Sequence, residues 1–279
     1  MNDTALPHYE LYAIRYYHRP ARRGEHFIFS DPKPDAPLDM DYFVWAAIGP
    51  ERSFVIDLGF SAATAARRGR TLLRCPIESL RLIGLDPASV QDVLLTHLHY
   101  DHAGNFPLLP AARFHVQESE LQFAASRRLG DPFFKPAYEI DDLVDVMRLA
   151  HAGRVVFYDG AAEVTPGIQL VPAPGHTAGL QVVRVHTRRG WVTLLSDTPH
   201  YFENLRARRP HPFTLDFGQT LDSYDRISST MGSWDKMIPG HDPLLLKMYP
   251  APSRELEGIV LKLDAEPDMS VFDAHWAAA

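Results

Sequence analysis

The chain has 279 residues, of which 46% are hydrophobic and 23% charged, as in an ordinary globular protein. The net charge of −7 gives little support to nucleic-acid binding, which relies on basic surface, and no apolar run approaches the roughly 20 residues that span a bilayer. Cys75 is the only cysteine, so an intrachain disulfide is excluded, and residues 1–10 lack the pattern of a secretory signal. We therefore expect a cytoplasmic protein without a nucleic-acid or membrane partner.

Strands and helices are mixed along the whole chain. The expected strands lie, in chain order, at 41–48, 53–58, 90–96, 113–116, 155–158, 168–171, 181–186, 191–195 and 236–238. Between them, helices are expected at 72–82, 118–128 and 223–231. No repeat or linker divides the chain, so we expect one domain over residues 1–279, of the α/β or α+β class.

The stretch 131–150 is harder to interpret than its neighbours. It begins with the aromatic residues Phe133, Phe134 and Tyr138 among prolines, and it ends in a helical pattern. One interpretation is an inserted lid or pocket wall. The other is that these aromatic side chains pack in the core or in a dimer interface, and the sequence leaves both open.

The run Thr96-His97-Leu98-His99-Tyr100-Asp101-His102 follows an apolar strand directly. Residues two apart in an extended segment point the same way, so His97, His99 and Asp101 converge, while His102 turns toward a neighbouring point. Imidazole nitrogens and carboxylate oxygens suit zinc, and also manganese or iron. An incidental histidine patch is disfavoured because four ligand-type residues occupy six positions. The run therefore predicts a metal site.

Further ligand-type residues also lie directly after strands or in a loop between strands. Asp197 and His241 each come after a short apolar strand, and His176 lies in a loop between two strands. Strand ends hold side chains rigidly, and loops leave them accessible. Asp57 also follows a strand, although as a single feature it could simply cap a turn. The sequence thus predicts one site assembled from several segments.

Taken in order, these motifs resemble those of the metallo-β-lactamase superfamily, from the Asp57-Leu58-Gly59 turn to His241. The resemblance implies a four-layer αβ/βα sandwich with two divalent metal ions at the edge of its two sheets. Zn²⁺ is the first expectation, with Mn²⁺ or Fe²⁺ as alternatives. One ion would be held by His97, His99 and His176, and the second by Asp101, His102 and His241, with Asp197 as the bridge. Asp57 matches a family position that supports and orients the ligands.

Within the superfamily, the chain is most similar to the N-acyl homoserine lactonase-like branch. The similarity is carried by 97–105, by Ser196-Asp197 with 203–205, and by 238–243. Flavodiiron-type oxidoreductases place a glutamate where His99 stands, and many β-lactam-hydrolysing members have a cysteine at the bridging position. RNase Z-like nucleases carry an additional arm for RNA, which the acidic balance disfavours.

This resemblance implies a lactonase, a carboxylic ester hydrolase that opens a small-molecule lactone by attack of a metal-bridging hydroxide. The substrate would be an N-acyl homoserine lactone, which makes quorum quenching the expected role, or a lactone of a catabolic pathway. Two alternatives stay open: a glyoxalase II-like hydrolase of another ester, thioester or amide, and a non-catalytic metal-binding protein. A homodimer is expected from the resemblance alone.

The expected catalytic residues are Asp101, which is also an expected metal ligand, His200 and Tyr201. Asp101 would pass a proton to the leaving oxygen. Signal lactonases carry a tyrosine three residues after the bridging aspartate, and it contacts the substrate carbonyl. Here that position is His200, with Tyr201 next to it, and either side chain can donate the hydrogen bond. This departure leaves the substrate open.

Overall fold

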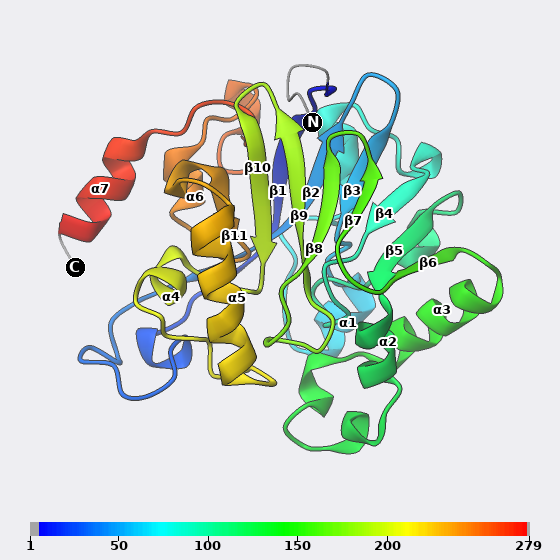
Figure 1. Ribbon diagram of the computed structural model, residues 1–279, viewed down its shortest axis with the longest axis horizontal. Helices are drawn as coiled ribbons and strands as arrows, with labels where there is room; N and C mark the ends of the chain where they lie inside the picture. The colour runs from blue at the N-terminus through cyan, green and yellow to red at the C-terminus, as the bar shows by residue number, and fades with distance from the viewer. Residues whose placement is uncertain (1–5, 278–279) are drawn as a thin grey trace.

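The computed structural model describes residues 6–277, which form two β-sheets packed face to face (Figure 1). The larger sheet contains, in spatial order, β12 (Val260–Lys262), β1 (Glu10–Arg19), β2 (Met40–Ile48), β3 (Ser53–Ile56), β4 (Asp92–Leu94), β5 (Arg113–Gln117) and β6 (Val155–Tyr158). The smaller sheet contains β11 (Met237–Pro239), β10 (Gly190–Ser196), β9 (Gln181–Thr187), β8 (Ile168–Pro172) and β7 (Ala162–Thr165).

Helices lie between the strands along the chain. The α-helices are α1 (Ala62–Arg67), α2 (Glu118–Ala124), α3 (Ile140–His151), α4 (Phe202–Arg206), α5 (Phe217–Thr230), α6 (Leu245–Met248) and α7 (Met269–Ala277). Short 3-10 helices span Arg23–Glu25, Glu78–Ile83, Pro87–Ser89, Phe106–Leu108, Arg127–Gly130, Lys135–Ala137, Trp234–Lys236 and Arg254–Leu256. Within residues 6–277, no helix combines the length and apolar character needed to cross a membrane.

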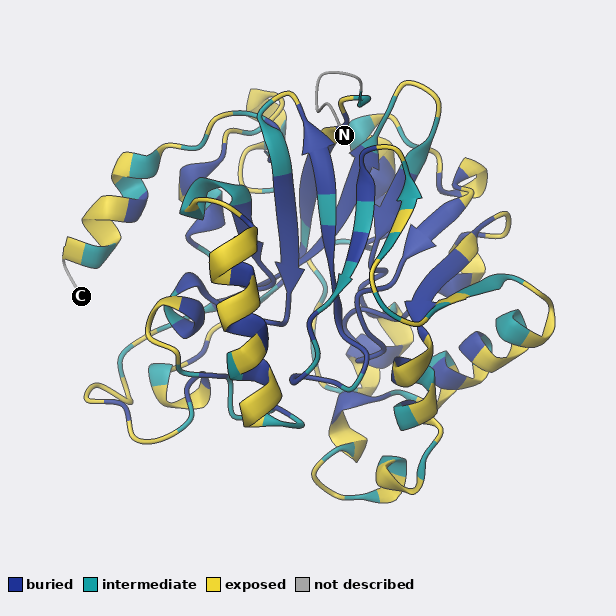
Figure 2. Ribbon diagram, in the orientation of Figure 1, coloured by how far each residue is buried: buried dark blue, intermediate teal, exposed yellow. Residues whose placement is uncertain are grey.

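The core is divided into layers by the two sheets. Between them, Trp45 of β2 and Ile56 of β3 share a buried cluster with Val183 of β9. On the outer face of the larger sheet, a second cluster includes Val146 of α3, and on the outer face of the smaller sheet a third includes Tyr224 of α5. Figure 2 shows the strands buried beneath half-exposed helices. This arrangement confirms the four-layer αβ/βα sandwich.

Most of the predicted strands are present, whereas two predictions differ from the structure. The hairpin around Gly49-Pro50 forms as expected, with Ile48 paired to Ser53. The helix predicted at 72–82 is wrong, since only the 3-10 helix Glu78–Ile83 forms there, and Pro76 disfavours helical geometry at the residue before it. The long strand β1 was not predicted because most of its residues are buried on both faces and show no alternation.

The topology places the carboxyl ends of several strands at one edge. Strands β3, β4, β5 and β6 pair in parallel, as do β10 and β11. Asp57 follows β3 and His97 lies shortly after β4, while Asp197 and His241 follow β10 and β11. Because parallel strands end at the same edge, the segments that carry these side chains meet there, at the lower side of Figure 1.

Candidate metal centre

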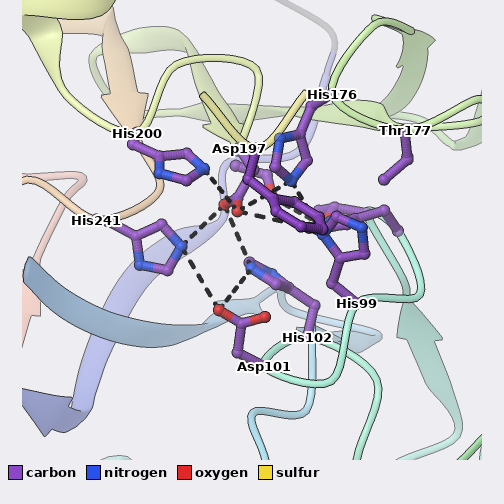
Figure 3. A network of polar contacts seen from close by, with 12 residues as sticks. His99, Asp101, His102, His176, Thr177, Asp197, His200 and His241 are labelled. Atoms are coloured by element: carbon purple, nitrogen blue, oxygen red, sulfur yellow. Dashed lines mark hydrogen bonds and ion pairs between the residues drawn. The ribbon is translucent and has the colours of Figure 1, made fainter. Parts of the chain in front are cut away.

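The structure brings together all seven predicted metal ligands, which converge from four segments of the chain (Figure 3). Each is at most 8% exposed. The ligands are His97, His99, Asp101 and His102 from the loop after β4, His176 from the β8–β9 loop, Asp197 after β10, and His241 after β11.

The ligand-type atoms fall into two main groups. In the first, His97, His99 and His176 offer nitrogens that lie within 4.8 Å of one another, and His176 Nε2 is 3.0 Å from His99 Nδ1. In the second, the ligand-type atoms also lie within 4.8 Å of one another, and they belong to Asp101, His102 and His241. The two groups match the two sets that the family resemblance implied.

Asp197 lies between the two groups and turns one oxygen toward each. Its Oδ2 lies 3.9 Å from His97 Nε2 and 3.5 Å from His176 Nε2. Its Oδ1 lies 3.3 Å from His102 Nε2 and 3.0 Å from His241 Nε2. This geometry fits a carboxylate that bridges two cations.

The chemistry of the donor atoms also fits divalent metal. Several buried atoms at this point have no hydrogen-bond partner among the described residues, including Nε2 of His97, His102 and His241, and Oδ1 of Asp197. Such unsatisfied atoms are rare in proteins and costly, so their convergence indicates a cation. Burial lowers the pKa of His97 and of His176 well below the ordinary value, which keeps these imidazoles in the neutral form that binds metal.

Contacts behind the ligands fix the orientation of their rings. Asp57 Oδ2 lies 2.7 Å from His102 Nδ1, and Asp57 Oδ1 accepts a hydrogen bond of 2.7 Å from the backbone N–H of Thr96. His241 Nδ1 lies 2.8 Å from the carbonyl oxygen of Asp41. Since Nδ1 is engaged in each ring, Nε2 faces the centre. Asp57 has a φ of 59°, a strained conformation that this network of contacts stabilises.

Glu120 is a buried residue of the site that sequence reasoning missed. Its side chain is 0% exposed and accepts hydrogen bonds of 3.0 Å from the N–H of Leu98, 2.7 Å from Thr177 Oγ1 and 2.8 Å from the N–H of Gly179. It therefore joins the loop of His97 to the loop of His176. In the sequence it is an ordinary glutamate in the first turn of a helix, so no signal distinguishes it.

The two candidates for substrate contact lie in different places. His200 lines the cavity, with Nε2 at 3.0 Å from Asp197 Oδ2, and it forms a further ligand-type group with His176 and Asp197. Tyr201 is 1% exposed, and its hydroxyl lies 3.1 Å from the carbonyl oxygen of Asp39 and 3.2 Å from His26 Nε2. Tyr201 does not line the cavity, so this placement favours His200.

A cavity of about 260 Å³ opens onto the ligands. Phe213 lines it and stacks on Phe133, with ring centroids 5.1 Å apart and an interplanar angle of 10°. Pro136 and Ala137, from the stretch 131–150, also line it. Residues of the wall that were not predicted are Arg19, Met40, Tyr42, Arg68, Arg70, Tyr100, His211 and Phe213.

Comparison with known proteins gives relatives that include N-acyl homoserine lactonases and probable metallo-hydrolases of mycobacteria. An N-acyl homoserine lactonase of Bacillus thuringiensis is 27% identical over 168 residues, which cover 60% of this chain and 61% of the relative. The N-acyl homoserine lactonase AttM of Agrobacterium fabrum is 24% identical over 176 residues, 60% of this chain and 64% of the relative. The matched stretch thus spans less than two thirds of these relatives.

A solved structure has the same fold. It is an N-acyl homoserine lactone hydrolase with the product N-hexanoyl-L-homoserine bound at its catalytic metal centre. The TM-score is 0.68 at 21% identity, over 84% of this chain and 93% of that one. The family model of the metallo-beta-lactamase superfamily matches residues 41–241, a range that includes all seven predicted ligands. The predicted resemblance is confirmed, and the chain belongs to the metallo-β-lactamase superfamily.

Proposed function

We propose that this chain is a hydrolase that uses two divalent metal ions to open small-molecule lactones. The observation that carries the proposal is the position of Asp197, whose two oxygens each face a separate group of buried ligand atoms. The relatives that are named N-acyl homoserine lactonases support lactones as the substrate class, with quorum quenching as one role.

We assign the candidate ligands to two metal positions. One ion would be held by His97, His99 and His176. The other ion would be held by Asp101, His102 and His241, and Asp197 would bind both ions. A site of three histidines suits Zn²⁺, and the mixed site suits Zn²⁺, Mn²⁺ or Fe²⁺. When bound, a pair of such ions lowers the pKa of a shared water and polarises a carbonyl oxygen.

The remaining side chains position the substrate and move protons. His200 Nε2 points into the cavity beside Asp197, where its N–H can donate to the developing oxyanion of the ester carbonyl. Asp101 Oδ2 lies 3.9 Å from both His102 Nε2 and His241 Nε2, so it is placed to hold a proton for the leaving ring oxygen. The stacking of Phe133 on Phe213, which lines the cavity, supports a role of the 131–150 stretch as a lid or pocket wall that limits the access of water.

One observation favours a second candidate function, the hydrolysis of another ester or thioester. His200 stands where the tyrosine of the signal lactonases is expected, so the group that contacts the carbonyl differs from theirs. An ester or thioester carbonyl presents the same oxygen to the same machinery. The two candidates therefore differ in what fills the cavity.

A pH-indicator screen of the Zn²⁺-loaded protein tests the proposal. The panel contains acyl-homoserine lactones of several lengths, simple γ-lactones, aromatic-catabolite lactones, a thioester and a β-lactam. We expect hydrolysis of at least one lactone class and its loss in Asp101→Asn, with His151→Ala as the exposed control. Activity confined to the thioester and the β-lactam would overturn the lactonase assignment.

A further inference from the structure

Three arginines line the same cavity as the metal ligands. Arg19, Arg68 and Arg70 come from β1 and from the segment after α1, and each is partly buried. The hydrolytic machinery described above uses none of them. Their positive charge in a small cavity is therefore a separate feature that needs a chemical explanation.

Two of the three guanidinium groups already have a carboxylate partner. Arg68 Nε lies 2.7 Å from Glu139 Oε1, and Arg19 Nη1 lies 2.6 Å from Glu25 Oε2. Arg70 differs, because no carboxylate forms an ion pair with it within residues 6–277. Its side-chain hydrogen bond goes to the hydroxyl of Tyr100.

The surroundings of Arg70 are mostly aromatic. Its guanidinium lies 5.5 Å from the ring centre of Tyr17, 5.7 Å from that of Phe60 and 5.1 Å from that of Tyr100. These rings hold the group in place and shield one side of it from water. The negative charge of Asp101 acts on Arg70, and a metal ion bound at Asp101 would offset that charge, which leaves Arg70 able to bind an anion from outside.

The carboxylates of the cavity cannot fill that role once the site is loaded. Asp101 and Asp197 line the cavity, but both lie among the metal-ligand groups. Two divalent ions would carry more positive charge than these two carboxylates and one hydroxide carry negative charge, so the loaded cavity would be positive. An incoming group that neutralises Arg70 must then come from the substrate.

We infer that the substrate carries a carboxylate, placed away from the bond that is cleaved and bound by Arg70, with Arg19 in the wall of the same cavity. The planar guanidinium matches a carboxylate through two parallel hydrogen bonds. The volume of about 260 Å³ is near the lower end of ligand pockets, which fits a short anionic lactone or ester better than a long acyl chain. This inference rests on the proposed function and names its substrate class.

The test compares two lactones that differ in one group, a free carboxylate in one and a carboxamide in the other. Both are measured with the Zn²⁺-loaded protein, with Arg70→Gln and Arg70→Lys, and with Arg81→Gln as a control, since Arg81 is exposed and paired with Glu78. We expect the carboxylate lactone to be preferred about 10- to 100-fold in kcat/KM. Arg70→Gln should remove the preference through KM, Arg70→Lys should retain part of it, and Arg81→Gln should retain it all.

The outcomes separate the two proposals. If the carboxamide is hydrolysed as well as the carboxylate by the unmodified protein, the anionic substrate is wrong and the hydrolase stands. If neither lactone nor any other lactone or ester is hydrolysed by the metal-loaded protein, the proposed function itself fails. If Arg70→Gln slows both lactones equally, Arg70 has a structural role. The comparison on the unmodified protein does not depend on any variant folding.

Discussion

Asp92 and Asp197 are both buried aspartates with histidine neighbours, and they are neutralised in different ways. Asp92 is 1% exposed and forms ion pairs with Arg52 and, at 3.1 Å, with Arg113, while His115 Nε2 lies 3.0 Å away. Asp197 is 4% exposed, and its Oδ1 has no hydrogen-bond partner among the described residues. The carboxylate of Asp92 is paired with arginines of the chain, whereas the carboxylate of Asp197 is available to bind metal cations.

The position of each residue along the sheet explains the difference. Asp92 begins β4, and His97 follows the end of the same strand at the opposite edge of the sheet. At the first edge, Arg52 and Arg113 form ion pairs with Asp92. At the other edge, the side chains grouped around Asp197 are histidines. A cluster of unsatisfied buried atoms on ligand-type side chains, rather than buried charge alone, therefore marks the functional end of the fold.

Removing metal should have the largest effect on activity and stability, because it acts at Asp197 and not at Asp92. Dialysis against a strong chelator should abolish hydrolysis and lower the free energy of unfolding, by about 2.7 kcal/mol relative to protein held at 100 times the metal's Kd. Zn²⁺ should restore both. The check is a rate assay with calorimetry on metal-free and reloaded protein. Full activity in metal-free protein would contradict the account.

The same substitution at the two aspartates should give opposite results. Asp197→Asn should lower kcat at least about 100-fold and reduce bound metal, because it removes the bridging charge. Asp92→Asn should cost about 3 kcal/mol of stability by breaking a buried ion-pair network, with kcat per folded molecule unchanged. Steady-state rates, metal content and denaturant unfolding measure these effects. A loss of kcat of similar size in both variants would remove the distinction.

Asp57→Asn should have an intermediate effect. It weakens the contact that fixes the ring of His102, so metal affinity or activity should fall about 10- to 100-fold. Competition with a chromophoric chelator gives the affinity. An unchanged affinity with normal turnover would mean that Asp57 only shapes the turn.

The metal ligands could be predicted from sequence because four of them lie within six residues after a strand. The family resemblance then supplied the grouping around Asp197. Residues such as Arg70 and Phe213 could not be predicted, since they reach the cavity from loops whose course depends on tertiary packing. Glu120 was missed because burial alone distinguishes it, and the choice between His200 and Tyr201 required the direction of each side chain.

The smallest effect concerns a third carboxylate, Asp142 in α3, which forms no ion pair among residues 6–277, although the charge of Arg67 acts on it. Burial raises its pKa to about 7, and Glu139 and Asp145 add to the shift. Its unfolded pKa is about 3.9, so the folded state binds more protons between these values and loses stability as pH rises through them. The stability that Asp142→Asn gains over the unmodified protein should therefore be larger at pH 8 than at pH 4. Thermal unfolding at both pH values measures it, and a difference independent of pH would contradict the assignment.

The most direct test of the two-metal centre is a stepwise addition of Zn²⁺ to metal-free protein, with lactone hydrolysis followed at each step. The arrangement of two ligand groups around Asp197 predicts that hydrolysis reaches its maximum at two ions per chain and that elemental analysis of the active protein gives the same ratio. Full activity at one ion per chain, with no further change at the second, would contradict the account.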